Sequence, residues 1–176
     1  LVTGATGGVG CIAVMILSKL GYKVTALTGK KDKKEFLKEL GASNILERQE
    51  LEGEHRNLDK GLWDGVVDTV GGKILANAIS QTKPAGIVAA CGLAASHKLE
   101  TTVMPFIIRG VKLWGIDCVM CSKKRREFIW NEAANLINFK ILEKYIKVVG
   151  LAELINIFPD ILQGKIAGRI IVDVKR

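Results

Sequence analysis

The stretch that decides the fold is residues 1–10, LVTGATGGVG, in which a short apolar run leads into a glycine-rich turn. Residues 11–20 (CIAVMILSKL) are apolar and long enough for a helix, and Gly21 follows them as a helix-ending C′ glycine would. Residues 22–28 (YKVTALT) then read as a second strand. A strand, a turn, a helix and a strand in this order predict a βαβ unit.

The spacing of the glycines indicates what the turn can hold. Compared with the dinucleotide pattern G-x-G-x-x-G, Gly7 and Gly10 occupy the second and third positions, Ala5 replaces the first, and Gly4 just before it can serve the tight turn. Gly7 allows the backbone close to a pyrophosphate, and Gly10 allows close packing of helix on strand. The free N–H groups of the first helical turn favour a phosphate. We therefore predict a dinucleotide site, with a purely structural turn as the alternative.

The end of the second strand distinguishes between the two nicotinamide cofactors. NAD-binding domains carry Asp or Glu here to accept a hydrogen bond from the ribose 2′-OH, whereas this chain has Thr28-Gly29-Lys30-Lys31. A hydroxyl, a backbone N–H and cations suit a 2′-phosphate, which a carboxylate would repel. The nearest acid, Asp32, falls in the next helical turn. NADP is therefore expected, and a solvated lysine cluster is the alternative.

The remaining apolar runs alternate between strand-like and helix-like segments. Near-continuously apolar strands that alternate with helices predict a parallel sheet covered on both faces. We expect an α/β fold with a doubly wound parallel sheet (Rossmann fold), three layers α/β/α, and one domain over residues 1–176. The expected strands are 44–46, 66–68, 86–91, 111–118 and 169–174, and the expected helices are 33–40, 74–81, 124–139 and 155–162.

Composition and charge narrow the function classes. The chain has 176 residues, 48% of them hydrophobic, which fits a folded domain and not a disordered one. Apolar runs are too short for a membrane span, and no secretory signal is visible, so a reduced, cytoplasmic protein without membrane contact is expected. The net charge of +8 comes from basic clusters at residues 30–34 and 123–126 without interleaved aromatics, which favours solvated helix starts over nucleic-acid binding. Because the chain begins with Leu1 inside a strand, we expect that its natural N-terminus is missing.

Several possible catalytic or metal-binding residues do not form a recognisable site. Cys118 and Cys121 form a C-x-x-C, but no second ligand pair lies at zinc spacing, so these thiols are expected to be structural and no metal site is predicted. His55 and His97 lie in polar loops and are expected to be solvated. Asp68 either contacts the cofactor or caps local structure. The tryptophans are expected to be packing residues: Trp63, Trp114 and Trp130.

The chain as a whole resembles the cofactor domain of the medium-chain dehydrogenase/reductases, which are zinc-type alcohol dehydrogenase-like. Within that superfamily it resembles the branch of acryloyl-CoA reductase (NADPH) and quinone oxidoreductases. The resemblance covers essentially all 176 residues and is carried by VTGATGGVG, LTGKK, KELGASNIL, WDGVVDTVGGK, VAACGLA, TTVMPFIIRGVKLWGIDCVM and GKIAGRIIV. It implies that a GroES-like catalytic domain precedes Leu1.

The resemblance also assigns roles to individual residues. It places Thr6, Gly7, Gly8 and Val9 at the pyrophosphate, Thr28 to Lys30 at the 2′-phosphate, and Arg48 near the adenosine phosphate. Thr28 and Lys30 stand where Ser and Arg are common in the branch, so the contacts would be those of a point charge. The cofactor-binding residues that it implies are Thr6, Gly7, Gly8, Val9, Gly10, Thr28, Gly29, Lys30, Arg48, Cys91, Gly92, Leu93, Ile107, Cys118 and Arg169, of which Cys91 to Leu93, Ile107 and Cys118 would lie along the nicotinamide.

The function implied by the resemblance is NADPH-dependent reduction of an α,β-unsaturated carbonyl compound, such as acryloyl-CoA, or of a quinone. The catalytic residues are unknown and are expected in the preceding domain, so this chain alone should bind NADPH weakly and turn over little. A homodimer paired through residues 111–118 is expected, with a small-molecule substrate and no nucleic acid. The alternative is a basic Rossmann module that senses NADPH or binds RNA without catalysis.

Overall fold

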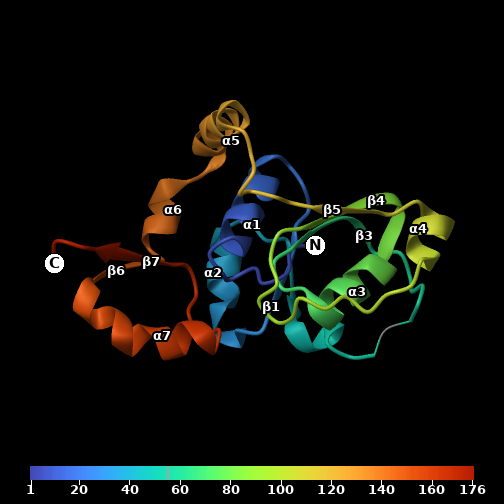
Figure 1. The fold of residues 1–176 in the computed structure, drawn as a ribbon, viewed down its shortest axis with the longest axis horizontal. Helices are drawn as coiled ribbons and strands as arrows, with labels where there is room; N and C mark the ends of the chain where they lie inside the picture. Colours follow the sequence, from blue (N-terminus) through green and yellow to red (C-terminus); the bar gives the residue numbers. More distant parts are fainter. Residues whose placement is uncertain (55) are drawn as a thin grey trace.

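The computed structural model describes residues 1–54 and 56–176, and its centre is a parallel sheet (Figure 1). Strand β1 (Thr25–Thr28) pairs with β2 (Asn44–Glu47), while β3 (Trp63–Asp68) pairs with β4 (Thr82–Ala90) and β4 with β5 (Lys112–Gly115). Val2 joins the two groups, because it forms parallel bridges to Ala26 of β1 and Val67 of β3. The resulting order β2-β1-Val2-β3-β4-β5 confirms the predicted doubly wound sheet.

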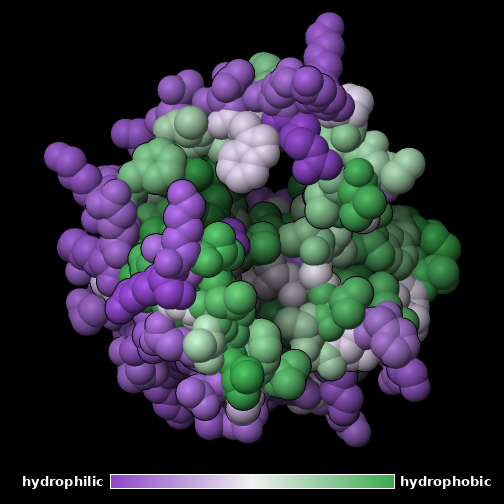
Figure 2. Space-filling model, turned by 60° about the vertical axis from the view of Figure 1, so that its left-hand side comes forward, coloured by the Kyte–Doolittle hydropathy of each residue, from purple (hydrophilic) through white to green (hydrophobic). Residues whose placement is uncertain are grey.

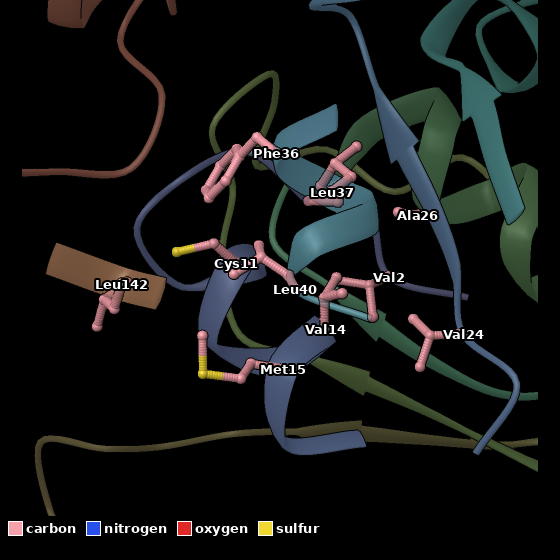
Figure 3. Packing of buried hydrophobic residues seen from close by; sticks show 11 residues of the cluster. Val2, Cys11, Val14, Met15, Val24, Ala26, Phe36, Leu37, Leu40 and Leu142 are labelled. Carbon is pink, nitrogen blue, oxygen red and sulfur yellow. The ribbon is translucent and has the colours of Figure 1, made fainter. Parts of the chain in front are cut away.

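Helices cover both faces of this sheet. Helices α1 (Gly10–Lys19) and α2 (Lys34–Glu39) pack on one face, around the buried cluster that Figure 3 shows. Helix α3 (Gly72–Ser80) packs on the other, in a second cluster. Strand β1 contributes Ala26 to the first cluster and Leu27 to the second, since successive side chains of a strand point to opposite faces. The three-layer α/β/α prediction is therefore confirmed.

The C-terminal part forms a smaller lobe beside the main sheet (Figure 1). Here β6 (Ile146–Gly150) and β7 (Arg169–Asp173) pair in parallel as a separate two-stranded sheet, and α7 (Leu154–Leu162) connects them. The remaining elements are short or peripheral: 3-10 turns η1 (Lys31–Lys33), η2 (Arg48–Leu51) and η3 (Leu151–Glu153), and helices α4 (Met104–Arg109), α5 (Lys123–Leu136) and α6 (Phe139–Glu143).

Some of the expected boundaries are wrong. The strand expected over 22–28 begins only at Thr25, and the one expected over 111–118 is limited to Lys112–Gly115, because only these residues have a partner strand. The expected helix 124–139 ends at Leu136. Strand β6 and helix α4 were not predicted.

Exposed apolar side chains gather around a hollow on the face that Figure 2 shows. Trp114 and Trp130 are 58% and 66% exposed, so the expectation that they pack in a core is wrong, whereas Trp63 packs against the second cluster. In the part of the chain that the structure describes, every helix is too short or too polar to cross a bilayer.

Candidate functional site

The glycine loop folds tightly against the start of α1. The Gly7 N–H donates to the Gly4 carbonyl over 2.9 Å, and the Cys11 N–H donates to the Gly7 carbonyl over 3.0 Å. A Cβ at Gly10 would overlap the Gly4 carbonyl oxygen, so only glycine allows this approach of helix and loop. Gly4 itself has φ of +57°, a conformation that glycine adopts without strain. The backbone is therefore shaped as the sequence pattern predicts.

Two buried hydroxyls and a lysine join the glycine loop to the end of β1. Thr6 Oγ1 and Thr28 Oγ1 lie 3.1 Å apart, and both residues are buried. Lys30 donates twice, from its backbone N–H to Thr28 Oγ1 over 3.0 Å and from Nζ to Thr6 Oγ1 over 3.3 Å. Thr28 thus fixes the backbone of Lys30, and Thr6 holds its ammonium group at the glycine loop.

Arg48 brings a second cation to the same place. Its side chain lies along Gly29, since a Cβ built there would be 3.3 Å from Arg48 Nε. Burial, and then the nearby charge of Arg48, lower the pKa of Lys30. Two cations held this close together form a site suited to a doubly charged anion.

The other lysines of the basic cluster are paired with carboxylates. Lys31 Nζ lies 2.7 Å from Glu47 Oε2, and Lys34 Nζ lies 3.9 Å from Glu47 Oε1. Lys33 Nζ lies 2.8 Å from Asp32 Oδ2. Among the described residues, Lys30 is the member of this cluster that has no ion pair. The structure therefore gives Lys30 a different role from the neighbouring lysines. The sequence alone does not distinguish them.

The C-terminal lobe closes one side of a cleft of about 740 Å³ above the glycine loop. The Gly168 N–H donates to the Thr6 carbonyl over 2.9 Å. The guanidinium of Arg169 covers the loop, since a Cβ at Gly8 would lie 3.0 Å from Arg169 Nη1. An anion above the loop would thus meet the Arg169 charge as well as backbone N–H groups.

Asp68, at the end of β3, has a structural role in this arrangement. It is fully buried, accepts a hydrogen bond from Thr3 Oγ1 over 2.6 Å and another from the Gly71 N–H over 2.8 Å. Burial raises the pKa of Asp68. Of the two roles left open, the contacts favour the cap, because both oxygens already serve the adjoining loops.

The structure brings together only part of the predicted cofactor residues. The predicted residues that line the cleft above the glycine loop are Thr6, Gly7, Gly8, Thr28, Gly29, Lys30, Arg48 and Arg169. Val9 is exposed at the start of α1, and Gly10 lies beneath the loop. The residues expected along the nicotinamide do not line this cleft, and their roles stay predictions: Cys91, Gly92, Leu93, Ile107 and Cys118.

Those five residues lie near the carboxyl ends of β4 and β5 or on α4. Gly92 is required by close packing, because a Cβ there would overlap the Thr69 carbonyl oxygen. Cys91 Sγ lies 3.2 Å from the Asp68 carbonyl, and burial followed by the Asp68 charge raises the pKa of its thiol. Leu93 and Ile107 are 65% and 76% exposed. Cys118 lines a different cavity of about 600 Å³ between β5 and α5.

Sequence reasoning missed a further set of lining residues. Ala94 and Ala95 follow the residues expected at the nicotinamide, and their small size after a strand end was an available signal. No local sequence signal indicates that the segment between α7 and β7 lines the cleft. It reaches the cleft because β6 pairs with β7. The missed lining residues are Gly4, Leu27, Thr69, Val70, Ile74, Ala94, Ala95, residues 161–166, Gly168 and Ile170.

The histidines and the C-x-x-C add no reactive cluster. His55 lies outside the described residues, and His97 is exposed as expected. Cys118 is exposed and Cys121 is half-buried, in the loop before α5. Within residues 1–54 and 56–176, no group of three or more His, Cys, Asp or Glu side chains is arranged to hold a metal ion.

Comparison with known proteins gives both sequence and structural relatives. The chain is 44% identical over 175 residues to the acrylyl-CoA reductase AcuI of Ruegeria pomeroyi, a match covering 99% of this chain and 53% of the relative. The yhdH oxidoreductase of Salmonella enterica, solved in complex with NADP, superposes with a TM-score of 0.94 at 43% identity and covers 98% of this chain and 53% of its own. Bacillus subtilis yhfP, solved with NAD bound, gives 0.89 at 43% identity over the same shares.

The chain thus spans about half the length of the curated relatives that it matches. Residues 8–152, from the glycine loop to the start of the C-terminal lobe, match the family described as zinc-binding dehydrogenase. This match, together with the glycine loop and the parallel sheet, confirms the resemblance noted in the sequence. The chain belongs to the zinc-binding dehydrogenase family.

Proposed function

We propose that this chain binds NADPH, with the adenosine 2′-phosphate in the pocket formed by Thr6, Thr28, Lys30 and Arg48. The observation that carries the proposal is the placement of Lys30 and Arg48, which bring two cations to the end of β1 where NAD-binding domains carry an acid. The NADP and NADPH in the solved Salmonella enterica and Escherichia coli relatives support it. The NAD in the Bacillus subtilis relative makes the choice of cofactor a necessary test.

The cleft fits the rest of a dinucleotide. Because Gly7 and Gly8 have no side chains, the pyrophosphate can approach the loop backbone, while Arg169 faces it from the C-terminal lobe. The nicotinamide half would then extend along the carboxyl ends of β4 and β5, toward Cys91 and Cys118. Ligands of doubly wound sheets bind at this edge.

For the whole protein, we infer reduction of an α,β-unsaturated carbonyl compound such as acryloyl-CoA, or of a quinone. NADPH, when bound, supplies the reducing equivalents, and the protein supplies position and electrostatics. Residues 1–176 would be the cofactor-binding domain. The groups that polarise and protonate the substrate would lie in the part of the relatives that this chain does not cover, because the cations that line the cleft, Lys30, Arg48 and Arg169, would serve the cofactor phosphates. Steady turnover of acryloyl-CoA or a quinone by residues 1–176 alone would contradict this division.

Calorimetric titration with NADPH and with NADH, at two salt concentrations, tests the cofactor assignment. We expect tighter binding of NADPH, and a preference that weakens with salt because the 2′-phosphate contacts are ionic. Lys30→Ala should weaken NADPH binding by about tenfold, the worth of one charge-assisted hydrogen bond, and leave NADH binding unchanged. Lys31→Ala is the matched control, because Lys31 already pairs with Glu47. Equal loss in both variants would mean that the cluster acts only through its total charge.

A homodimer paired through β5 is the assembly that we propose. Lys112–Gly115 is exposed throughout and pairs with β4 along one side, while its other edge carries no strand among the described residues. An open strand edge readily pairs with another chain. Sedimentation at increasing concentration should show a dimer, and a monomer at every concentration would refute this for the chain.

The alternative function, a basic module that binds RNA, rests on the net charge of +8 and on the exposed start of α5. Steeply salt-dependent RNA binding that NADPH displaces would favour it. The pairing of Lys31, Lys33 and Lys34 with carboxylates counts against it, because these charges are already compensated within the chain.

A further inference from the structure

Glu52, just beyond the proposed 2′-phosphate pocket, holds one of the two cations that form it. Its Oε1 lies 2.8 Å from Arg48 Nε, one helical turn earlier in the chain. The two side chains are 54% and 42% exposed, for Arg48 and Glu52 respectively. Solvent therefore screens the pair, and its direct contribution to folding is small. Its geometric effect on Arg48 can be larger.

The contact with Glu52 decides which part of the guanidinium is free. Arg48 lies flat along Gly29, with Nε, Cζ and Cδ within 3.6 Å of where a Cβ would be. Glu52 takes the Nε donor, and the structure shows no partner among the described residues for Nη1 and Nη2. Since a guanidinium is rigid and planar, holding Nε fixes the direction of the other donors. Arg48 lines the cleft together with Lys30 and Thr28.

We propose that Glu52 is a positioning residue that sets the preference of this site for NADPH by holding the Arg48 guanidinium toward the 2′-phosphate. The inference rests on the proposed function and names a residue that the sequence analysis did not consider. Gly29 contributes by leaving room for the arginine to lie flat. A side chain at that position would displace Arg48 and weaken the alignment.

Two effects of Glu52 on the phosphate have opposite signs, which makes the inference testable. As a negative charge near an anion site, Glu52 repels the phosphate, so its removal should tighten NADPH binding. As a positioning group it orders Arg48 in advance, so its removal should weaken NADPH binding. Because both side chains are substantially exposed, solvent reduces the repulsion more than it reduces the positioning.

The experiment measures the dissociation constants of NADPH and NADH for the full-length protein and its variants. Their ratio gives the preference for NADPH. We expect Glu52→Ala to lower the preference for NADPH by about two- to fivefold, as for an exposed ion pair, and so by less than the loss expected for Lys30→Ala. Glu52→Gln keeps an acceptor for Nε and should recover part of the preference. Glu54→Ala is the matched control, as it removes the same charge two residues later, where the described residues show no contact with Arg48.

Each outcome has a definite meaning. An unchanged or increased preference in Glu52→Ala, in a protein whose wild type prefers NADPH, overturns the role of Glu52 and leaves the cofactor assignment in place. A wild type without preference for NADPH overturns both. In the Arg48→Ala background the Glu52→Ala change should no longer alter the ratio, and a persisting effect would show that Glu52 acts without Arg48.

Discussion

The burial of large apolar side chains differs between residues 1–111 and residues 112–176. The first part supplies nearly all members of two buried clusters on the two faces of the sheet, although Leu93, Val103, Ile107 and Ile108 stay exposed. In the second part, burial is confined to Leu142, Val149 and Ile157, while large apolar side chains stay exposed on β5, α5, α7 and their loops (Figure 2). The most exposed of them are Val119, Met120, Trp130, Ile155, Leu162 and Val174.

Residues 1–111 therefore have a nearly complete core of their own, and residues 112–176 do not. Contiguous exposed apolar side chains mark surfaces that contact other protein. The curated relatives are about twice as long as this chain, so further protein is available to cover such surfaces. We expect the exposed faces of the second part to be covered by other protein, such as a second copy of this chain, in the assembled state.

Truncating a side chain in each part gives the largest expected contrast. Leu37 on α2 is 0% exposed, and Leu37→Ala should lower the free energy of unfolding by about 2–5 kcal/mol. Leu162 at the end of α7 is 87% exposed, and Leu162→Ala should change it by less than about 0.5 kcal/mol. Urea unfolding of the two variants measures both values. Similar losses would mean that the second part is as well packed as the first.

Substituting a glycine in each of the two parts should give a smaller difference in the free energy of unfolding. At Gly10 an alanine Cβ would meet the backbone of Gly4 and Ala5, so Gly10→Ala should cost about 1–3 kcal/mol, as overpacking does, and should also weaken NADPH binding. Gly164, between α7 and β7, has open space around it but φ of +65°, so Gly164→Ala should cost about 1 kcal/mol through backbone strain alone. Unfolding and calorimetry together decide the comparison, and a Gly10→Ala protein with normal binding would contradict it.

The smallest effects concern the pH dependence of stability. Burial raises the folded-state pKa of Asp68 above 3.8, so the wild type should lose stability relative to Asp68→Asn as pH rises from about 4 through that pKa. Glu39 behaves oppositely, because its hydrogen bond with Lys144, just after α6, lowers its pKa below 4.5. The wild type should lose stability relative to Glu39→Gln as pH falls through that lowered pKa. Thermal unfolding between pH 3 and 7 checks both slopes, and slopes of the same sign would refute the assignment.

Prediction from the sequence succeeded where the signal is local. The spacing of Gly7 and Gly10 predicted the loop geometry, and the alternation of apolar runs predicted the parallel sheet, since both depend on neighbouring residues. The strand at residues 22–28 was predicted too long, because Lys23 and its neighbours have strand-like composition but no partner strand. Strand β6 was missed, because it pairs only with β7, some twenty residues later in the chain.

The residues of the candidate site were likewise predicted only in part from the sequence. The sequence indicated Thr28, Gly29 and Lys30 from their place after a strand, and Arg48 and Arg169 only through the family resemblance. It could not show that Glu47 pairs with Lys31 and Lys34 while Lys30 turns to Thr6, because these contacts join β1, β2 and the glycine loop. Nor could it show that residues 161–166 and Gly168 line the cleft.

By itself, the sequence determined the fold class, the glycine loop and the basic end of β1, because each is written in residues that are adjacent along the chain. The tertiary structure alone decided which cations remain without a carboxylate partner, how Arg48 comes to lie along Gly29, and which apolar faces stay exposed. These features depend on distances between segments that are far apart in sequence, and such distances arise only when the sheet and its covering helices have packed.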